Sequence, residues 1–129
     1  MQAFIVVLWI ISAAFIAVSA LHLFLGIGAD ALLGSPITPE MSKSPSIDSQ
    51  NRFYGVTFAL FGVVLLVSTS NLHRYQPMIV ATLAVLFAAG IARAVSWILH
   101  GAPSPAIIGI LCADLVLPPV LYGWLKLVL

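Results

Sequence analysis

The chain has 129 residues, of which 62% are hydrophobic and only 7% are charged, and its formal net charge is +1. An ordinary soluble domain has about 25% charged residues, so this composition indicates an integral membrane protein. With five Lys and Arg residues in total, the chain has neither a basic nucleic-acid surface nor a polybasic patch for lipid headgroups. A nucleic-acid partner is therefore not expected, and the lipid bilayer is the expected surroundings.

A transmembrane helix needs about 20 predominantly apolar residues. Four runs meet this requirement, at residues 3–25, 53–70, 78–99 and 106–128. We therefore predict a single all-α domain, residues 1–129, in which four transmembrane helices form an antiparallel bundle. One long loop separates the first helix from the second.

The first run turns polar toward its end, at Ser19 and His22. Its start carries no Lys or Arg, and it is longer than the apolar region of a secretory signal, so we interpret it as a retained span. Residues 26–34 predict a short amphipathic turn on the membrane surface. Residues 35–51 hold three prolines and several serines, which predicts a loop, as a lid or docking segment, and not a continuous helix. The last of these residues, 48–51, predict a cap for the second helix.

The second and third runs each carry a row of small residues at helical spacing. These are Gly55, Ala59 and Gly62 in the second run, and Ala84, Ala88 and Ala92 in the third. Small residues let the backbones of two membrane helices approach closely. We expect both rows to pack against other helices.

The fourth run contains the single cysteine, Cys112, and the pair Pro118-Pro119. One cysteine excludes an intrachain disulfide and a multi-cysteine metal site. A proline has no N–H group, so the carbonyl groups of Asp114 and Leu115 lose their helical partners. We expect a kink in this helix, and carbonyl oxygens that need another partner.

Two charges of opposite sign interrupt the third and fourth runs at Arg93 and Asp114. At 1.5 Å rise per residue they lie about 10 and 13 Å inside the same end of the bundle. One such charge at mid-membrane costs roughly 2.5 to 3.5 kcal/mol on insertion scales, so two at matching depth predict an ion pair.

Six further polar or aromatic residues are expected at this end of the bundle: Tyr54, His22, Trp97, Thr57, Arg52 and His100. Together with Arg93 and Asp114 they form the predicted polar cluster. The cluster has three interpretations: a structural ion pair that fixes the helix register, a ligand-binding or proton-handling site, and a contact with a partner subunit.

Metal binding and the common catalytic classes have little support in this sequence. His22, His100 and Asp114 suggest a two-histidine, one-carboxylate site, but close ligand spacing such as His-x-x-x-His is missing. Nucleophile motifs and phosphate-binding loops are missing as well. We expect no metal, no cofactor and no catalytic residue.

Positive charge predicts the orientation of the chain. Arg74 and Lys126 share one side with the amino terminus. On the other side, two basic residues are offset by three acidic ones: Lys43 and Arg52, against Asp30, Glu40 and Asp48. By the positive-inside rule, both termini are expected in the cytoplasm.

Several short motifs carry a family resemblance. They are Arg-Phe-Tyr-Gly at residues 52–55, Gly-Ile-Ala-Arg at 90–93, His-Gly-Ala-Pro-Ser-Pro at 100–105, and an acid in the middle of the fourth run. From Leu21 onward the chain resembles a family of short four-span bacterial membrane proteins catalogued as a domain of unknown function. In that family the acid is commonly Glu, so Asp114 is one methylene shorter. The resemblance implies the four-helix fold and a bacterial inner membrane, but it supplies no reaction.

Two functions remain open. The first is a non-catalytic accessory or interaction subunit of a larger membrane complex, with other subunits or further copies of the chain as partners, stabilised by the Arg93–Asp114 pair. The alternative is a binder or converter of a lipophilic small molecule, such as a quinone, lipid or terpenoid, at the non-cytoplasmic end. Arg93 would then hold a polar head group, Asp114 would orient Arg93 or exchange a proton, and Tyr54, His22 and Trp97 would line the mouth.

Overall fold

The computed structural model describes all 129 residues and contains helices but no strands. The four long helices are α1 (Gln2–Leu25), α4 (Pro45–Ser68), α5 (Leu72–His100) and α6 (Pro105–Val128). Two short helices, α2 (Gly28–Leu32) and α3 (Pro39–Lys43), lie between α1 and α4. All four long helices are long and apolar enough to cross a membrane. The prediction of an all-α, four-helix, multi-pass membrane protein is confirmed.

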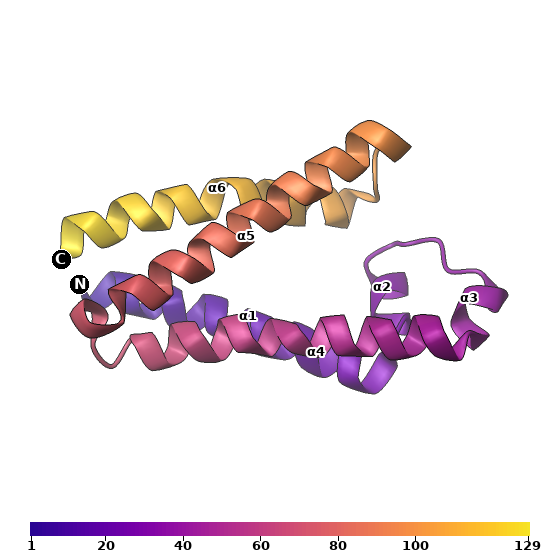
Figure 1. Cartoon of the computed structure of the whole chain (residues 1–129), viewed down its shortest axis with the longest axis horizontal. Coiled ribbons are helices and arrows are strands. Elements are labelled where there is room, and N and C mark those ends of the chain that lie inside the picture. Colours follow the sequence, from indigo (N-terminus) through magenta and orange to yellow (C-terminus); the bar gives the residue numbers. More distant parts are fainter.

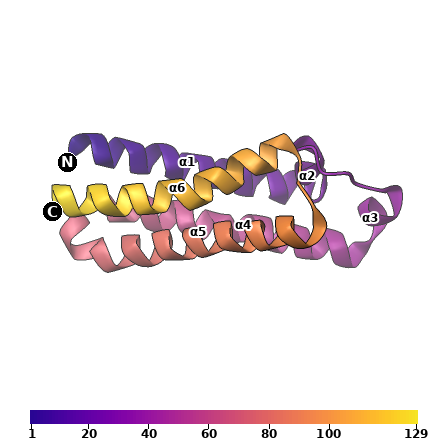
Figure 2. The ribbon, with the colours of Figure 1, turned by 90° about the horizontal axis from the view of Figure 1, so that it is seen from above.

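The long helices pair as two hairpins. In the first hairpin α1 packs along α4, in the second α5 packs along α6, and α4 and α5 connect the two. Figure 1 shows the hairpins close together at the end that holds both termini and spread apart at the other end, beside α2 and α3. We refer to these as the closed end and the open end. Seen from above in Figure 2, all four long helices run along one common direction.

The hydrophobic core lies at the closed end. Its eight buried residues are Phe4, Leu8, Leu65, Leu72, Ile79, Leu83, Leu121 and Leu125. They come from the start of α1, the end of α4, the start of α5 and the end of α6, which are the segments that meet at the closed end. The ring of Phe4 packs edge-on against Trp124, with ring centroids 5.4 Å apart. The helices therefore pack most densely near the two termini.

The predicted loop at residues 35–51 is wrong in its second half, because α4 already begins at Pro45. The cap comes from Ser44, whose side chain accepts a hydrogen bond from the backbone nitrogen of Ile47 at 3.4 Å, and not from residues 48–51. Pro45 stands at the first helical position, where its missing N–H group costs no hydrogen bond. The proline that suggested a loop is in fact part of a helix start.

The third span also begins earlier than residue 78. Helix α5 starts at Leu72, where the side chain of Asn71 accepts a hydrogen bond from the backbone nitrogen of Arg74 at 3.0 Å. Pro77 therefore lies inside the helix. Helix α6 continues through Pro118 and Pro119, and Figure 2 shows its ribbon changing direction about midway. The two prolines redirect the helix without ending it.

Two of the predicted small residues bring α1 and α4 together. A Cβ atom placed at Gly62 would lie 2.8 Å from the carbonyl oxygen of Ser12, and one placed at Gly55 would overlap the ring of His22. This close approach confirms the expectation for the second span. On α5, by contrast, the predicted row of Ala84, Ala88 and Ala92 is exposed.

Candidate functional site

Arg93 and Asp114 form an ion pair inside the second hairpin. The Nε group of Arg93 donates a hydrogen bond to Oδ2 of Asp114 at 3.0 Å. Gly90, one turn before Arg93, lets α6 approach closely, since a Cβ atom there would lie 3.0 Å from Cβ of Asp114 and 2.9 Å from Leu115. This short distance between α5 and α6 explains how the shorter aspartate side chain reaches the arginine.

The ion pair is incompletely covered by the chain. The side chain of Arg93 is 32% exposed and that of Asp114 is 17% exposed. A guanidinium group has five N–H donors, and only the one on Nε of Arg93 has an acceptor within the chain. The pair therefore presents several unused donors at membrane depth.

A small apolar cavity adjoins Asp114 between the two hairpins. Its volume is about 50 Å³, and all four long helices line it, with Ile11, Leu65, Leu86 and Leu117 among the lining residues. Asp114 is the one charged residue on its wall. The acidic member of the pair thus contacts the bundle interior as well as Arg93.

A second polar group lies in the first hairpin, around His22. The Nδ1 atom of this buried ring lies 2.9 Å from the carbonyl oxygen of Val18, where it must donate, because a carbonyl oxygen only accepts. Its Nε2 atom lies 3.5 Å from Oδ1 of Asp30, which belongs to α2. The other oxygen of Asp30 accepts a hydrogen bond from Nδ2 of Asn51 on α4. Through these contacts Asp30 ties α2 to both α1 and α4.

Arg52 completes this second group. Its Nε group donates to Oδ2 of Asp48 at 2.7 Å, one helical turn earlier on α4. One of its terminal nitrogens donates to the carbonyl oxygen of Leu23 at 2.5 Å, near the end of α1. Arg52 therefore joins the start of α4 to the end of α1 and has no contact with the Arg93–Asp114 pair.

Four predicted residues join neither group. Tyr54 is 60% exposed and packs edge-on against Phe53, and the hydroxyl of Thr57 donates to the carbonyl oxygen of Tyr54 at 2.6 Å. Trp97 and His100 are exposed and follow Arg93 along one face of α5, one and two turns later. The single cluster that the sequence predicts is therefore divided between the two hairpins.

Several of the polar contacts were not predicted from the sequence. Asp48 and Arg52 are an i,i+4 pair, which a correct start of α4 would have revealed. Asp30 meets His22 and Asn51 only through the turn at α2, for which the sequence gives no spacing rule. The hydroxyl of Ser104, between α5 and α6, donates to the carbonyl oxygen of Leu33 at 2.6 Å and thereby joins the hairpins at the open end.

The side chains that commonly bind metal ions do not form a cluster in this fold. The chain holds no group of three or more His, Cys, Asp or Glu residues that could hold one metal ion. His100 lies at the end of α5, whereas His22 is paired with Asp30 on α2. The Arg93–Asp114 pair itself offers hydrogen-bond donors and two opposite charges.

Comparison with known proteins places the chain in a family. Neither the curated proteins nor the solved structures contain a match. One family model, described as "Domain of unknown function (DUF4345)", matches residues 3–125, which is nearly the whole chain. The match agrees with the resemblance carried by the motifs of spans two to four. The chain belongs to this family of domains of unknown function, DUF4345.

Proposed function

We propose that this protein is a non-catalytic accessory or interaction subunit of a larger membrane complex, and that Arg93 is its docking point. The observation that carries the proposal is the exposed third of the Arg93 side chain, whose remaining N–H donors have no acceptor within the chain. Unsatisfied polar groups cost several kcal/mol each in hydrocarbon. A transmembrane helix of a partner that supplies an oxygen acceptor would remove this cost.

The surface beside Arg93 suits such a partner. Ala92 and Ala88 form an exposed row of small residues on α5, directly before Arg93 along the chain. Small residues allow close helix–helix packing in membranes. The matching row on α4 is already used by α1, so the alanine row is the face that remains for another subunit, or for a second copy of the chain.

For the location we propose a bacterial inner membrane with both termini in the cytoplasm. Arg74 and Lys126 at the closed end support this orientation through the positive-inside rule. The test is labelling of intact cells with a membrane-impermeant maleimide, in a Cys112→Ala background. A cysteine at Ser42 is expected to react and one at Ser70 is not, whereas the reverse pattern would invert the topology.

A second candidate function is the binding of a lipophilic small molecule with a polar head, such as a quinone, lipid or terpenoid. It is supported by the exposed side of Arg93, against which such a head group would lie. The apolar cavity beside Asp114 is too small to enclose the ligand, since its volume is about 50 Å³ and ligand pockets have about 300 to 1,000 Å³. A head-group oxygen could accept from the free N–H groups of Arg93. No arrangement of side chains adds support for a conversion of such a ligand.

Native mass spectrometry of the protein, solubilised gently from its host membrane, separates the two functions. The subunit proposal predicts masses above small multiples of the 13.7 kDa chain, with other polypeptides present. Arg93→Ala should lose these partners while circular dichroism stays unchanged, and Lys43→Ala, a cation outside the spans, should keep them. A bare chain or homo-oligomer with a small-molecule adduct that Arg93→Ala loses would support the second function instead.

A further inference from the structure

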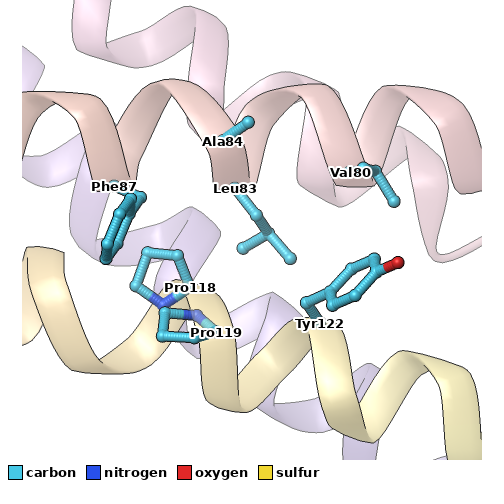
Figure 3. Close-up of a pocket in the computed structure, with 7 residues that line it drawn as sticks. All are labelled: Val80, Leu83, Ala84, Phe87, Pro118, Pro119 and Tyr122. Carbon is cyan, nitrogen blue, oxygen red and sulfur yellow. The ribbon is translucent and has the colours of Figure 1, made fainter.

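A groove runs along the second hairpin, between α5 and α6. Its volume is about 230 Å³ and its walls are almost wholly apolar. Figure 3 shows Val80, Ala84 and Phe87 above the space, with Pro118, Pro119 and Tyr122 below it. We propose that this groove binds one acyl chain of an anionic phospholipid, whose phosphate pairs with Lys126.

The shape of the groove follows from the residues that line it. In Figure 3 the side chain of Leu83 points from α5 toward α6, between the rings of Phe87 and Tyr122. Pro118 and Pro119 form the wall on α6, and Ala84 adds only a methyl group to the wall on α5. Ligand pockets for drug-sized molecules have volumes of about 300 to 1,000 Å³. A groove of about 230 Å³ with open sides suits part of a flexible chain better than a ring system.

The polar end of the groove is at Tyr122. In Figure 3 its hydroxyl points away from the two prolines, toward the Val80 side, which is the closed end of the bundle. The ammonium group of Lys126 lies 5.6 Å from the centroid of the Tyr122 ring. Tyr and Lys at the end of a membrane helix occupy the headgroup level. A chain lying in the groove would thus place its headgroup beside Lys126.

Charge favours an anionic headgroup at this end. Lys126 has no Asp or Glu partner within the chain. The four acidic residues are Asp30, Glu40, Asp48 and Asp114. Three of them belong to the α2–α4 region of the open end, and Asp114 is paired with Arg93. A lipid phosphate is the available counter-charge, and Arg74 at the start of α5 adds a second cation at the same end.

The test is a lipid titration of the purified protein, followed by native mass spectrometry. The probes are phosphatidylglycerol and phosphatidylcholine with identical acyl chains. One phosphatidylglycerol per chain is expected, bound about fivefold more tightly than phosphatidylcholine, since one Lys near the surface contributes about that factor. Lys126→Gln should remove this preference. Ala84→Leu, which adds bulk to the wall of the groove, should weaken the binding of both lipids.

Two matched variants serve as controls. Ala81→Leu adds the same side chain at an exposed position of α5 that does not line the groove, and Lys43→Gln removes a cation at the open end. Both should leave lipid binding unchanged. Equal retention of the two lipids, or a preference that survives Lys126→Gln, would overturn the proposal. Because the proposal does not involve Arg93, Arg93→Ala should keep the lipid even where it loses a partner subunit.

Discussion

The two ends of the bundle are held by different interactions. At the closed end, eight buried apolar residues from all four long helices form one continuous core. At the open end, side-chain pairs take the place of an apolar core: His22 with Asp30, Arg52 with Asp48, and Arg93 with Asp114. Each of these pairs lies within one hairpin. A single hydrogen bond, from Ser104 to Leu33, connects the two hairpins there.

This difference separates the part of the molecule that sets the fold from the part that leaves polar groups free for a partner subunit. In lipid, helices associate through packing and hydrogen bonds and not through a hydrophobic driving force. The closed end satisfies this requirement within the chain, since its core residues are fully packed. The open end leaves donors of Arg93 without acceptors. We therefore expect stability to depend mainly on the closed end, and docking of a partner subunit on the open end.

The largest expected effect is the loss of packing at the closed end. Leu65 is 0% exposed, so Leu65→Ala leaves a cavity, and the free energy of unfolding should fall by about 2 kcal/mol, the lower limit of the range for buried leucines. Titration with sodium dodecyl sulfate in bicelles measures this quantity. Leu60→Ala on the same helix, where the side chain is 64% exposed, should change it by less than about 0.5 kcal/mol. Equal losses in the two variants would contradict the assignment of the core.

The second-largest effect on stability is expected at the contact between α1 and α4, two helices that extend from the closed end to the open end. Gly62→Ala places a methyl group 2.8 Å from the carbonyl oxygen of Ser12 and should lower the free energy of unfolding by about 1 to 2 kcal/mol. Gly123→Ala is the matched control, because a Cβ atom at Gly123 meets nothing within 4 Å. There the better helix propensity of alanine should leave stability unchanged or slightly raised. If Gly62→Ala instead raised the free energy of unfolding, the two helices would be able to separate at little cost.

The sequence predicts the spans and the Arg93–Asp114 contact for the same physical reason. Polar groups without hydrogen-bond partners are costly in hydrocarbon. Long apolar runs must therefore be helices, which satisfy the backbone groups, and charges in the middle of a span must find partners. The start of α4 was not predicted, since Ser44-Pro45 is equally compatible with a loop and with a helix start. The local geometry at that point, and not composition, decides between the two.

The division of the predicted cluster has another cause. Counting residues along a helix gives the depth of a side chain, but not the angle between hairpins. Tyr54 and Trp97 lie at suitable depth on α4 and α5, yet those helices spread apart toward the open end. His22 is bound by Asp30, which reaches it through a turn flanked by Gly26 with φ +55°. Such a turn is compatible with many positions of α2, so the pairing follows only from the folded chain.

The ion pairs of the open end should contribute less than the core. A double-mutant cycle with Arg93→Met and Asp114→Leu should give a coupling energy of about 1 kcal/mol, within the range measured for polar contacts in membranes. The same cycle with Arg52→Met and Asp48→Leu is the comparison, because these side chains are 39% and 32% exposed. Their coupling should be smaller, because water and salt screen an exposed i,i+4 pair. A larger coupling for the second pair would assign the main polar contact to the first hairpin.

The smallest effect on stability is expected from Ser104→Ala, which removes the hydrogen bond to Leu33. One neutral hydrogen bond contributes about 0.5 to 1.5 kcal/mol, and the free energy of unfolding should fall by the lower of these values. The distance between the hairpins at the open end should change more clearly in Ser104→Ala than the free energy of unfolding does. Spin labels at Phe24 and Ile98, exposed positions near the open end of α1 and α5, should report a broader distance distribution in double electron–electron resonance.

The closed end supplies the control for this distance measurement. Labels at Val6 and Leu127, exposed positions near the closed ends of α1 and α6, should give the same distribution with and without Ser104→Ala, because the apolar core fixes these segments. All labelled proteins carry Cys112→Ala, since Cys112 is exposed. If the open-end distribution stays narrow in Ser104→Ala, packing of α2 and its neighbours, and not the hydrogen bond, sets the spacing. If both distributions broaden, the two ends move together and the contrast between them is lost.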